Sequence, residues 1–201
     1  MLSGRFSLSN QNPIGSEKQS NLLSQNLTSE NYVEQSKGSE RQKRKASESA
    51  LEASYSMMPQ DANTLGNVYG GTIMKLMDSL AAAVAERHCR KNTVTASIDR
   101  MDFFKPVYIG NLLILRASVN YTGTTSMEIG VRIEAENLRT GTVAHTGSSY
   151  LTFVALDENG KPVLIPEIVP ETEEEKRRYL EGMRRRQERL ALLTKQKQAS
   201  E

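Results

Sequence analysis

Apolar residues recur at helical spacing in one long stretch of the chain, residues 71–90. Between its larger apolar side chains this stretch carries mostly alanine, so it is small as well as apolar. The larger apolar positions are Ile73, Leu76, Met77, Leu80 and Val84. A helix that is apolar on nearly every side is usually buried on most sides. The pattern therefore predicts one long, buried helix around which the rest of the domain is organised.

After this helix the pattern changes to the period of strands. Alternating or strongly apolar runs predict four strands, at residues 94–103, 112–121, 127–137 and 143–156, and a shorter strand over 51–58 precedes the helix. Because the four strands are joined by short connections, we expect consecutive strands to pair antiparallel. The sequence thus predicts a single α+β domain, in which an antiparallel sheet wraps around a central helix.

The two ends of the chain differ from this middle part. Residues 1–50 are mostly polar or charged, and such a segment buries too little apolar surface to offset the entropy of ordering, so we expect a disordered tail. Residues 51–170 are the predicted domain. Residues 171–201 are predicted to form a charged C-terminal helix, since Thr172 and Glu175 have the spacing of a capping box.

Both ends carry a basic cluster. Residues 41–45 read Arg-Gln-Lys-Arg-Lys, which is either a nucleic-acid patch or, as we favour, a solvated charge run. No helix-turn-helix pattern accompanies this cluster. Arg184, Arg185 and Arg186 lie in the predicted C-terminal helix. That helix is an exposed terminal helix, a surface that packs on a neighbouring subunit, or a basic lip for an anionic ligand.

Composition narrows the class of protein. The chain has 201 residues and a formal net charge of +2, so it exerts no strong attraction on nucleic acid as a whole. No apolar run reaches the roughly 18 residues that span a bilayer, and we expect no membrane partner. The single cysteine, Cys89, fits a reducing compartment, so a cytoplasmic location is expected. With only His88, His145 and Cys89 as soft ligands, no structural metal site is expected.

The start of the long helix is the first candidate for chemistry. Gly70 and Gly71 lie where the backbone N–H groups of a helix are free and its dipole is positive, a combination that binds anions and polarises carbonyl groups. Asn67 precedes them and is placed either to orient water or a carbonyl group, or simply to form the turn.

Asp78 is the second candidate. It is the only carboxylate between Asp61 and Glu86, and a charge in an apolar helix costs free energy unless it is paired or functional. Either Asp78 takes part in catalysis or it is a structural carboxylate with hydrogen-bonded neighbours. Other nucleophiles fit poorly, because the chain has no Gly-x-Ser-x-Gly motif and because Cys89 and its neighbour His88 do not face each other on a helix.

Several motifs together are similar to those of the hotdog-fold acyl-CoA thioesterases, the family of the cytosolic acyl-CoA hydrolase and of bacterial short-chain acyl-CoA thioesterases. The resemblance covers about residues 55–189. It rests on seven segments that occur in the family's order, residues 66–78, 87–89, 94–99, 103–107, 123–129, 152–156 and 169–173. It implies a hotdog fold in which the sheet wraps around the central helix.

The resemblance also implies an enzyme that hydrolyses acyl-CoA to a free fatty or other carboxylic acid and CoA without a metal or redox cofactor. Asn67 and Asp78 match the two positions that activate water across a dimer interface, and which of them acts on the water stays open. The Gly71 amide would polarise the thioester carbonyl. Because the animal enzyme has two such domains and this chain has one, we expect a homodimer, assembled as a trimer of dimers. Candidate CoA-binding residues are Gly70, Gly71, Arg87, Lys105, Thr125 and Ser126.

Two alternatives remain at this point. A non-catalytic hotdog regulator that binds CoA esters would normally carry a DNA-binding module, and none is evident. A hotdog hydratase would need an Asp–His pair near the start of the helix. His88 lies at the far end of the helix and His145 lies on a late strand, so this second alternative is weaker.

Overall fold

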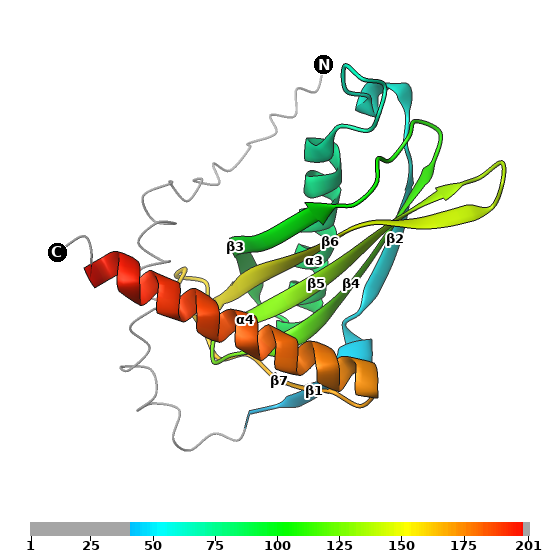
Figure 1. Cartoon of the computed structure of the whole chain (residues 1–201). Helices are drawn as coiled ribbons and strands as arrows, with labels where there is room; N and C mark the ends of the chain where they lie inside the picture. The colour runs from blue at the N-terminus through cyan, green and yellow to red at the C-terminus, as the bar shows by residue number, and fades with distance from the viewer. Residues whose placement is uncertain (1–40, 199–201) are drawn as a thin grey trace, which may run out of the picture. The chain divides into compact units, whose positions relative to one another are not determined.

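The computed structural model describes residues 41–198, and the first 40 residues of the predicted disordered tail lie outside them. A five-stranded antiparallel sheet has the strand order β2-β4-β5-β6-β3. Its strands are β2 (Leu51–Ser56), β3 (Asn92–Phe103), β4 (Leu112–Thr122), β5 (Ser126–Asn137) and β6 (Thr142–Leu156). The long helix α3 (Gly70–Cys89) lies on one face of the sheet, and α4 (Glu173–Gln198) lies on the other (Figure 1).

Alternation along the strands separates the two faces of the sheet. On β4 and β5 every second residue points at α3, and these side chains form the core with the buried side of the helix. Fully buried examples are Leu113 and Leu115 of β4 and Ile129 and Ile133 of β5, and Phe153 of β6 joins them. A curved antiparallel sheet around one helix is the hotdog fold, so the predicted architecture is confirmed.

The helix α3 is buried on one side only. Its buried positions include Ile73, Met77 and Val84, all at most 2% exposed, whereas Gly71 and Lys75 are exposed and Met74 is 39% exposed. The expectation of a helix buried nearly all round is therefore wrong for a single chain. One sheet covers one side of a helix, and the opposite side, which carries small residues together with Lys75, Asp78 and Glu86, is left open.

The expectation that consecutive strands pair is confirmed for β4–β5 and β5–β6 but is wrong for β3 and β4. Strand β3 pairs with β6 at the edge of the sheet, from Asn92 opposite Leu156 to Phe103 opposite Gly147. Residues 104–111 carry the chain back across to β4. A connection of this length can join either paired or separated strands, so the sequence pattern alone does not reveal which strands are neighbours.

Residues 41–50, which we had assigned to the disordered tail, are ordered. Here β1 (Lys43–Lys45) and the 3-10 helix η1 (Ala46–Glu48) lead into β2, and a second 3-10 helix, η2 (Pro59–Asp61), follows β2. Strand β1 pairs in parallel with β7 (Glu167–Val169). The ordered chain therefore begins before the predicted domain boundary.

The basic cluster at residues 41–45 is not simply solvated. Arg41 donates to the carbonyl oxygens of Ile165 at 3.0 Å and Gly123 at 2.7 Å, and Arg44 donates to the carbonyl of Arg87 at 3.2 Å. These guanidinium groups donate hydrogen bonds to carbonyl groups that are not paired within the sheet, and so they hold the N-terminal segment against the domain.

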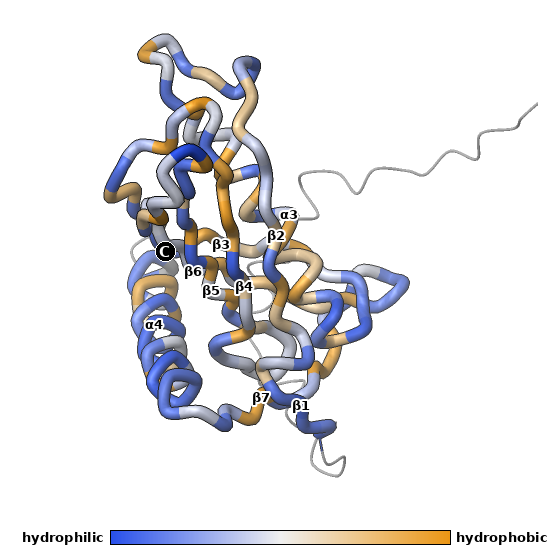
Figure 2. Tube along the Cα trace, turned by 90° about the vertical axis from the view of Figure 1, so that its right-hand side faces the viewer, coloured by the Kyte–Doolittle hydropathy of each residue, from blue (hydrophilic) through white to orange (hydrophobic). Residues whose placement is uncertain are grey.

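The predicted C-terminal helix is present as α4, and its capping box is confirmed. The hydroxyl of Thr172 accepts the N–H of Glu175 at 3.2 Å, and the Glu175 carboxylate accepts the N–H of Thr172 at 2.9 Å. Figure 2 shows that α4 is hydrophilic along most of its length. It is attached to the outer face of the sheet largely through arginines: Arg185 pairs with Glu128 of β5, and Arg189 pairs with Asp99 of β3.

Candidate active site

The first turn of α3 presents free backbone donors. Tyr69 is the residue before the helix, and no side chain caps the turn. The N–H of Thr72 reaches the carbonyl of Tyr69 at 3.0 Å, but within residues 41–198 the N–H groups of Gly70 and Gly71 have no acceptor. A Cβ atom at position 71 would lie 2.5 Å from the Tyr69 ring, so a glycine is needed where the ring covers this turn.

A cavity of about 330 Å³ opens beside this turn. One wall is polar and comes from the loop before the helix, with Asn63, Asn67 and Gly70. The other wall is mostly apolar and comes from the end of β3 and the link after it, with Phe103 and Phe104 among its residues. The two phenylalanines are 48% and 57% exposed and adjacent in the chain, so this wall offers apolar surface to a ligand.

Asn63 has its side-chain orientation fixed by the loop. Its Oδ1 atom accepts the N–H of Leu65 at 2.9 Å and that of Asn67 at 3.1 Å. The Nδ2 group has no hydrogen-bond partner among the described residues, so this donor is available to a ligand in the cavity. Asn63 was not among the site candidates that the sequence suggested.

Asp78 lies two turns further along α3. It is half-buried rather than fully buried as expected, and its Oδ1 atom accepts a hydrogen bond from the Thr95 hydroxyl of β3 at 2.8 Å. Thr95 was not predicted to contribute, because only the packing of β3 against α3 brings it to Asp78. The hydrogen bond leaves the other carboxylate oxygen free of partners in the described chain.

Gly71 and Asp78 share the open side of α3. They are seven residues apart, which places them on one face of the helix but about 10 Å apart along its axis. Within one chain that separation is too large for both groups to contact one thioester carbon. The structure therefore offers two half-sites on one surface, a donor half at the start of α3 and a carboxylate half in its middle.

The predicted CoA-binding residues fall in different places. Lys105 lines the cavity with Asn67 and Gly70. Arg87 is exposed near the far end of α3, and Thr125 and Ser126 lie on the turn between β4 and β5. None of these last three residues lines the cavity of the same chain.

The turn at residues 123–126 carries a feature that the sequence did not reveal. A Cβ atom on Gly123 would lie 3.1 Å from Nε of Arg186, so the α4 guanidinium packs directly on this turn. Arg186 is half-buried and forms no ion pair with another described residue. The hydroxyl groups of Thr125 and Ser126 likewise form no hydrogen bond with another described residue, so a cation and hydroxyl donors are together available to an anion.

The remaining reactive side chains are structural. Burial raises the pKa of the Cys89 thiol, which therefore stays protonated and a poor nucleophile. His88 is fully buried, donates from Nε2 to the Pro166 carbonyl at 3.2 Å and lies 3.5 Å from the Ser49 hydroxyl. Burial lowers its pKa, so it remains neutral.

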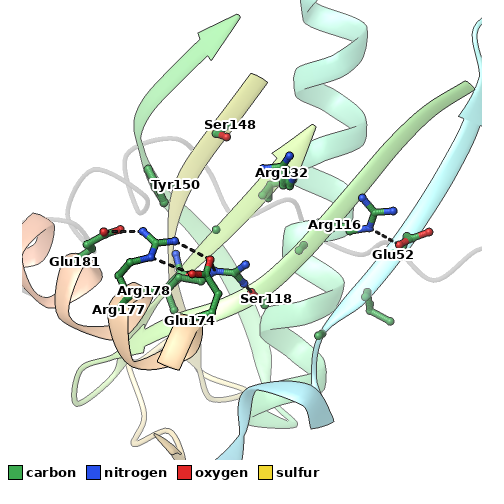
Figure 3. Close-up of a pocket in the computed structure, with 16 residues that line it drawn as sticks. Glu52, Arg116, Ser118, Arg132, Ser148, Tyr150, Glu174, Arg177, Arg178 and Glu181 are labelled. Carbon is green, nitrogen blue, oxygen red and sulfur yellow. Dashed lines mark hydrogen bonds and ion pairs between the residues drawn. The ribbon is translucent and has the colours of Figure 1, made fainter. Parts of the chain in front are cut away.

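A larger cleft of about 500 Å³ lies between the outer face of the sheet and α4 (Figure 3). Its arginines are already neutralised by glutamates: Arg177 and Arg178 pair with Glu174, and Arg116 pairs with Glu52. None of the predicted site residues lines this cleft. Although this cleft is larger than the cavity at the start of α3, it is therefore the weaker candidate for the active site.

Two features are absent from the described part of the chain. Residues 41–198 contain no group of three or more His, Cys, Asp or Glu side chains arranged to hold a metal ion. No helix within this range is both long and apolar enough to cross a membrane.

Comparisons with known proteins agree with this geometry. The family model of the thioesterase superfamily matches residues 65–142. An uncharacterised acyl-CoA thioester hydrolase of Bacillus subtilis is 47% identical over 119 residues, which are 59% of this chain and 69% of the relative. The crystal structure of an apo-hexameric acyl-CoA thioesterase has a TM-score of 0.72 and 40% identity, and the match covers 74% of this chain and 95% of that one.

An acyl-CoA hydrolase of Staphylococcus aureus, solved with butyryl-CoA, CoA and CoA disulfide, has a TM-score of 0.73 and 38% identity, with 78% of this chain and 96% of that chain covered. A sheet wrapped around one helix with free amides at its start is the hotdog architecture of thioesterases. The chain belongs to the thioesterase superfamily, and acyl-CoA thioester hydrolases are its relatives.

Three structures of the Staphylococcus aureus hydrolase carry alanine in place of an asparagine, an aspartate or a threonine. In that chain the asparagine precedes the aspartate by fifteen residues, and the threonine follows it by seventeen. Asn63, Asp78 and Thr95 have the same spacing here. The three residues that the geometry singles out therefore coincide with those selected for substitution in a relative.

Proposed function

We propose that this chain hydrolyses acyl-CoA thioesters to a carboxylic acid and CoA. The observation that carries the proposal is the open face of α3, which presents the free Gly71 amide at one end and the Asp78–Thr95 pair in the middle. The first polarises a carbonyl group and the second activates water, and a thioesterase needs both. The names of the relatives support the same activity.

The active site lies between two copies of the chain. If two α3 helices pack antiparallel on their open faces, centred near Met74 and Lys75, Gly71 of one copy comes opposite Asp78 of the partner subunit. A two-fold axis repeats the contact, so one dimer holds two sites. The hexameric relatives support a further assembly of three such dimers.

The reaction follows from these groups. The thioester oxygen accepts hydrogen bonds from the Gly71 N–H and the Asn63 Nδ2 group while Asp78 of the partner subunit removes a proton from water. The hydroxide adds to the carbonyl carbon, and the tetrahedral intermediate then collapses by breaking the C–S bond. The proton held by Asp78 passes to the leaving sulfur, which departs as the CoA thiol. Asn67 stays a candidate for positioning the water.

The two ends of the substrate have separate contacts. The apolar wall with Phe103 and Phe104 receives the acyl chain. The phosphates of CoA lie on the turn with Thr125 and Ser126, beside Arg186. Gly70, Arg87 and Lys105 remain candidates for contacts along the CoA arm. No step calls for a metal or redox cofactor, so dialysis against a chelator should leave the rate unchanged.

The test measures thiol release from acyl-CoA esters with a thiol reagent. Replacing Asp78 by Asn should lower kcat by about 10²–10⁴ because the general base is lost, with the oligomer intact. Glu86→Gln removes an exposed carboxylate from the same helix and should leave kcat unchanged. Full activity of Asp78→Asn contradicts the mechanism. Binding of acyl-CoA by the wild type without any thiol release contradicts the enzymatic function and favours a CoA-ester-binding regulator.

A further inference from the structure

A buried ion pair on the outer face of the sheet takes no part in the mechanism above. Glu128 of β5 is 2% exposed, and its carboxylate accepts two hydrogen bonds from Arg185, from Nη2 at 2.7 Å and from Nε at 3.0 Å. Asn120 of β4 donates a third at 3.1 Å. A buried carboxylate with this many charge-assisted bonds holds its partner in one geometry.

Two further contacts fix the position of α4 at this point. The Arg185 guanidinium lies 3.6 Å from the centroid of the Tyr150 ring. One turn earlier, a Cβ atom at Gly182 would lie 2.9 Å from Cβ of Tyr121 and 3.0 Å from Oε1 of Glu128. The glycine thus lets the helix backbone approach the sheet closely, and neither rotation nor sliding of α4 preserves these contacts together.

Stability alone does not account for the pair. Replacing a buried ion pair by well-packed apolar residues is often neutral or stabilising, because desolvation offsets the attraction of the charges. What the pair does supply is a defined orientation for the next residue along the helix. Arg186 follows Arg185 directly and packs on Gly123, at the turn where Thr125 and Ser126 carry their free hydroxyl groups.

We propose that Glu128 and Arg185 are positioning residues that hold Arg186 against the turn at residues 123–126, so that it receives the phosphates of CoA. The inference rests on the proposed function for the identity of the anion, and it assigns a role to a pair that never contacts the substrate. Displacement of α4 by a fraction of a turn would move the Arg186 guanidinium away from the turn while leaving Asp78 and Gly71 in place.

The experiment compares the binding of CoA and of pantetheine, which has the same thiol arm without the nucleotide phosphates, by titration calorimetry. In Glu128→Gln the Kd for CoA should rise about tenfold, whereas that for pantetheine should change less than about twofold. Arg186→Ala should show the same selective loss of affinity for CoA. The double variant should bind CoA no more weakly than Arg186→Ala, since both substitutions remove the same contact between Arg186 and the phosphates.

Arg185→Lys provides a second test if Glu128→Gln fails to fold, because lysine keeps the charge but loses the two-bond geometry. Glu174→Gln, which removes an exposed carboxylate from the same helix, is the matched control and should bind CoA normally. An unchanged Kd for CoA in the folded Glu128 or Arg185 variant overturns the proposal, and so does an equal loss for CoA and pantetheine. Thiol release by the wild type reports separately on the proposed function.

Discussion

At the residue scale, the sequence singles out the glycines and Asp78 as candidates but not Asn63 or Thr95, which the folded chain places beside them. A glycine pair before an apolar helix and a lone carboxylate within it are both visible as breaks in a regular pattern. Asn63 lies in an irregular loop, where asparagine is common for reasons of turn geometry alone. Its role depends on Oδ1 accepting two N–H groups from Leu65 and Asn67, an arrangement that only the folded loop reveals. Thr95 reaches Asp78 through tertiary packing in the same way.

The structure predicts that Asn63 matters more for the rate than Asn67. Asn63→Ala removes a donor to the oxyanion and should lower kcat by about 10²–10³. Asn67→Ala leaves that donor in place, because the Asn63 side chain accepts a hydrogen bond only from the backbone N–H of residue 67. We therefore expect Asn67→Ala to lower kcat by about tenfold or less. Thiol-release kinetics on both folded variants decide the point, and the reverse ranking contradicts the assignment.

His88 predicts a pH dependence of stability. Burial lowers its pKa below the ordinary value of 6.5, while Arg41 and Arg44 lower it further and Glu48 and the Pro166 carbonyl oppose the shift. Below about pH 6.5 the His88 imidazole therefore binds a proton more readily in the unfolded chain than in the folded chain. The contribution of neutral His88 to the free energy of unfolding is fully present above about pH 6.5. It is lost as the pH falls from there toward the lowered pKa of the folded chain.

Urea unfolding between pH 8 and pH 5 measures this effect. In the wild type the midpoint should fall more steeply below pH 6.5 than in His88→Gln, in which no imidazole titrates at this site. His145→Asn, which removes the half-buried histidine of β6, is the control and should keep the wild-type dependence. Identical pH profiles for wild type and His88→Gln count against the argument.

At the scale of elements, period and turn residues predicted every major helix and strand of the domain. The order of the strands was less accessible, because pairing of β3 with β6 is a long-range choice that local pattern does not encode. The ordering of residues 41–50 was missed for a related reason. This segment has few apolar residues, and its place is set by parallel pairing with β7 and by arginines that bind carbonyl groups.

Arg41 should therefore contribute to stability in a way that its neighbour Lys43 does not. Arg41→Ala removes hydrogen bonds to the carbonyls of Ile165 and Gly123, at a cost of about 1–3 kcal/mol in the free energy of unfolding. Lys43→Ala, in the exposed basic cluster, should change it by less than about 0.5 kcal/mol. Equal effects of the two changes on urea unfolding would show that the cluster is merely solvated.

At the scale of the whole molecule, the proposed mechanism makes one chain an incomplete enzyme. Its core is closed by the sheet, yet α3 keeps an open face that carries both chemical groups at a separation of about 10 Å. The sequence predicted a shared site from the family resemblance. The structure supports that proposal with a physical reason, since two α3 helices packed antiparallel on their open faces would bring each donor end opposite the partner's carboxylate.

The most direct test of this shared site is complementation between two inactive variants. Asn63→Ala and Asp78→Ala chains, carrying different affinity tags, are co-expressed, and the assemblies that contain both chains are purified. In a mixed dimer one site keeps both wild-type groups and the other site loses both. The account predicts about half of the wild-type thiol release per mixed dimer, and about a quarter for a random mixture of dimers. Activity no higher than that of the two variants alone would contradict it, because a site built within one chain cannot be restored by mixing.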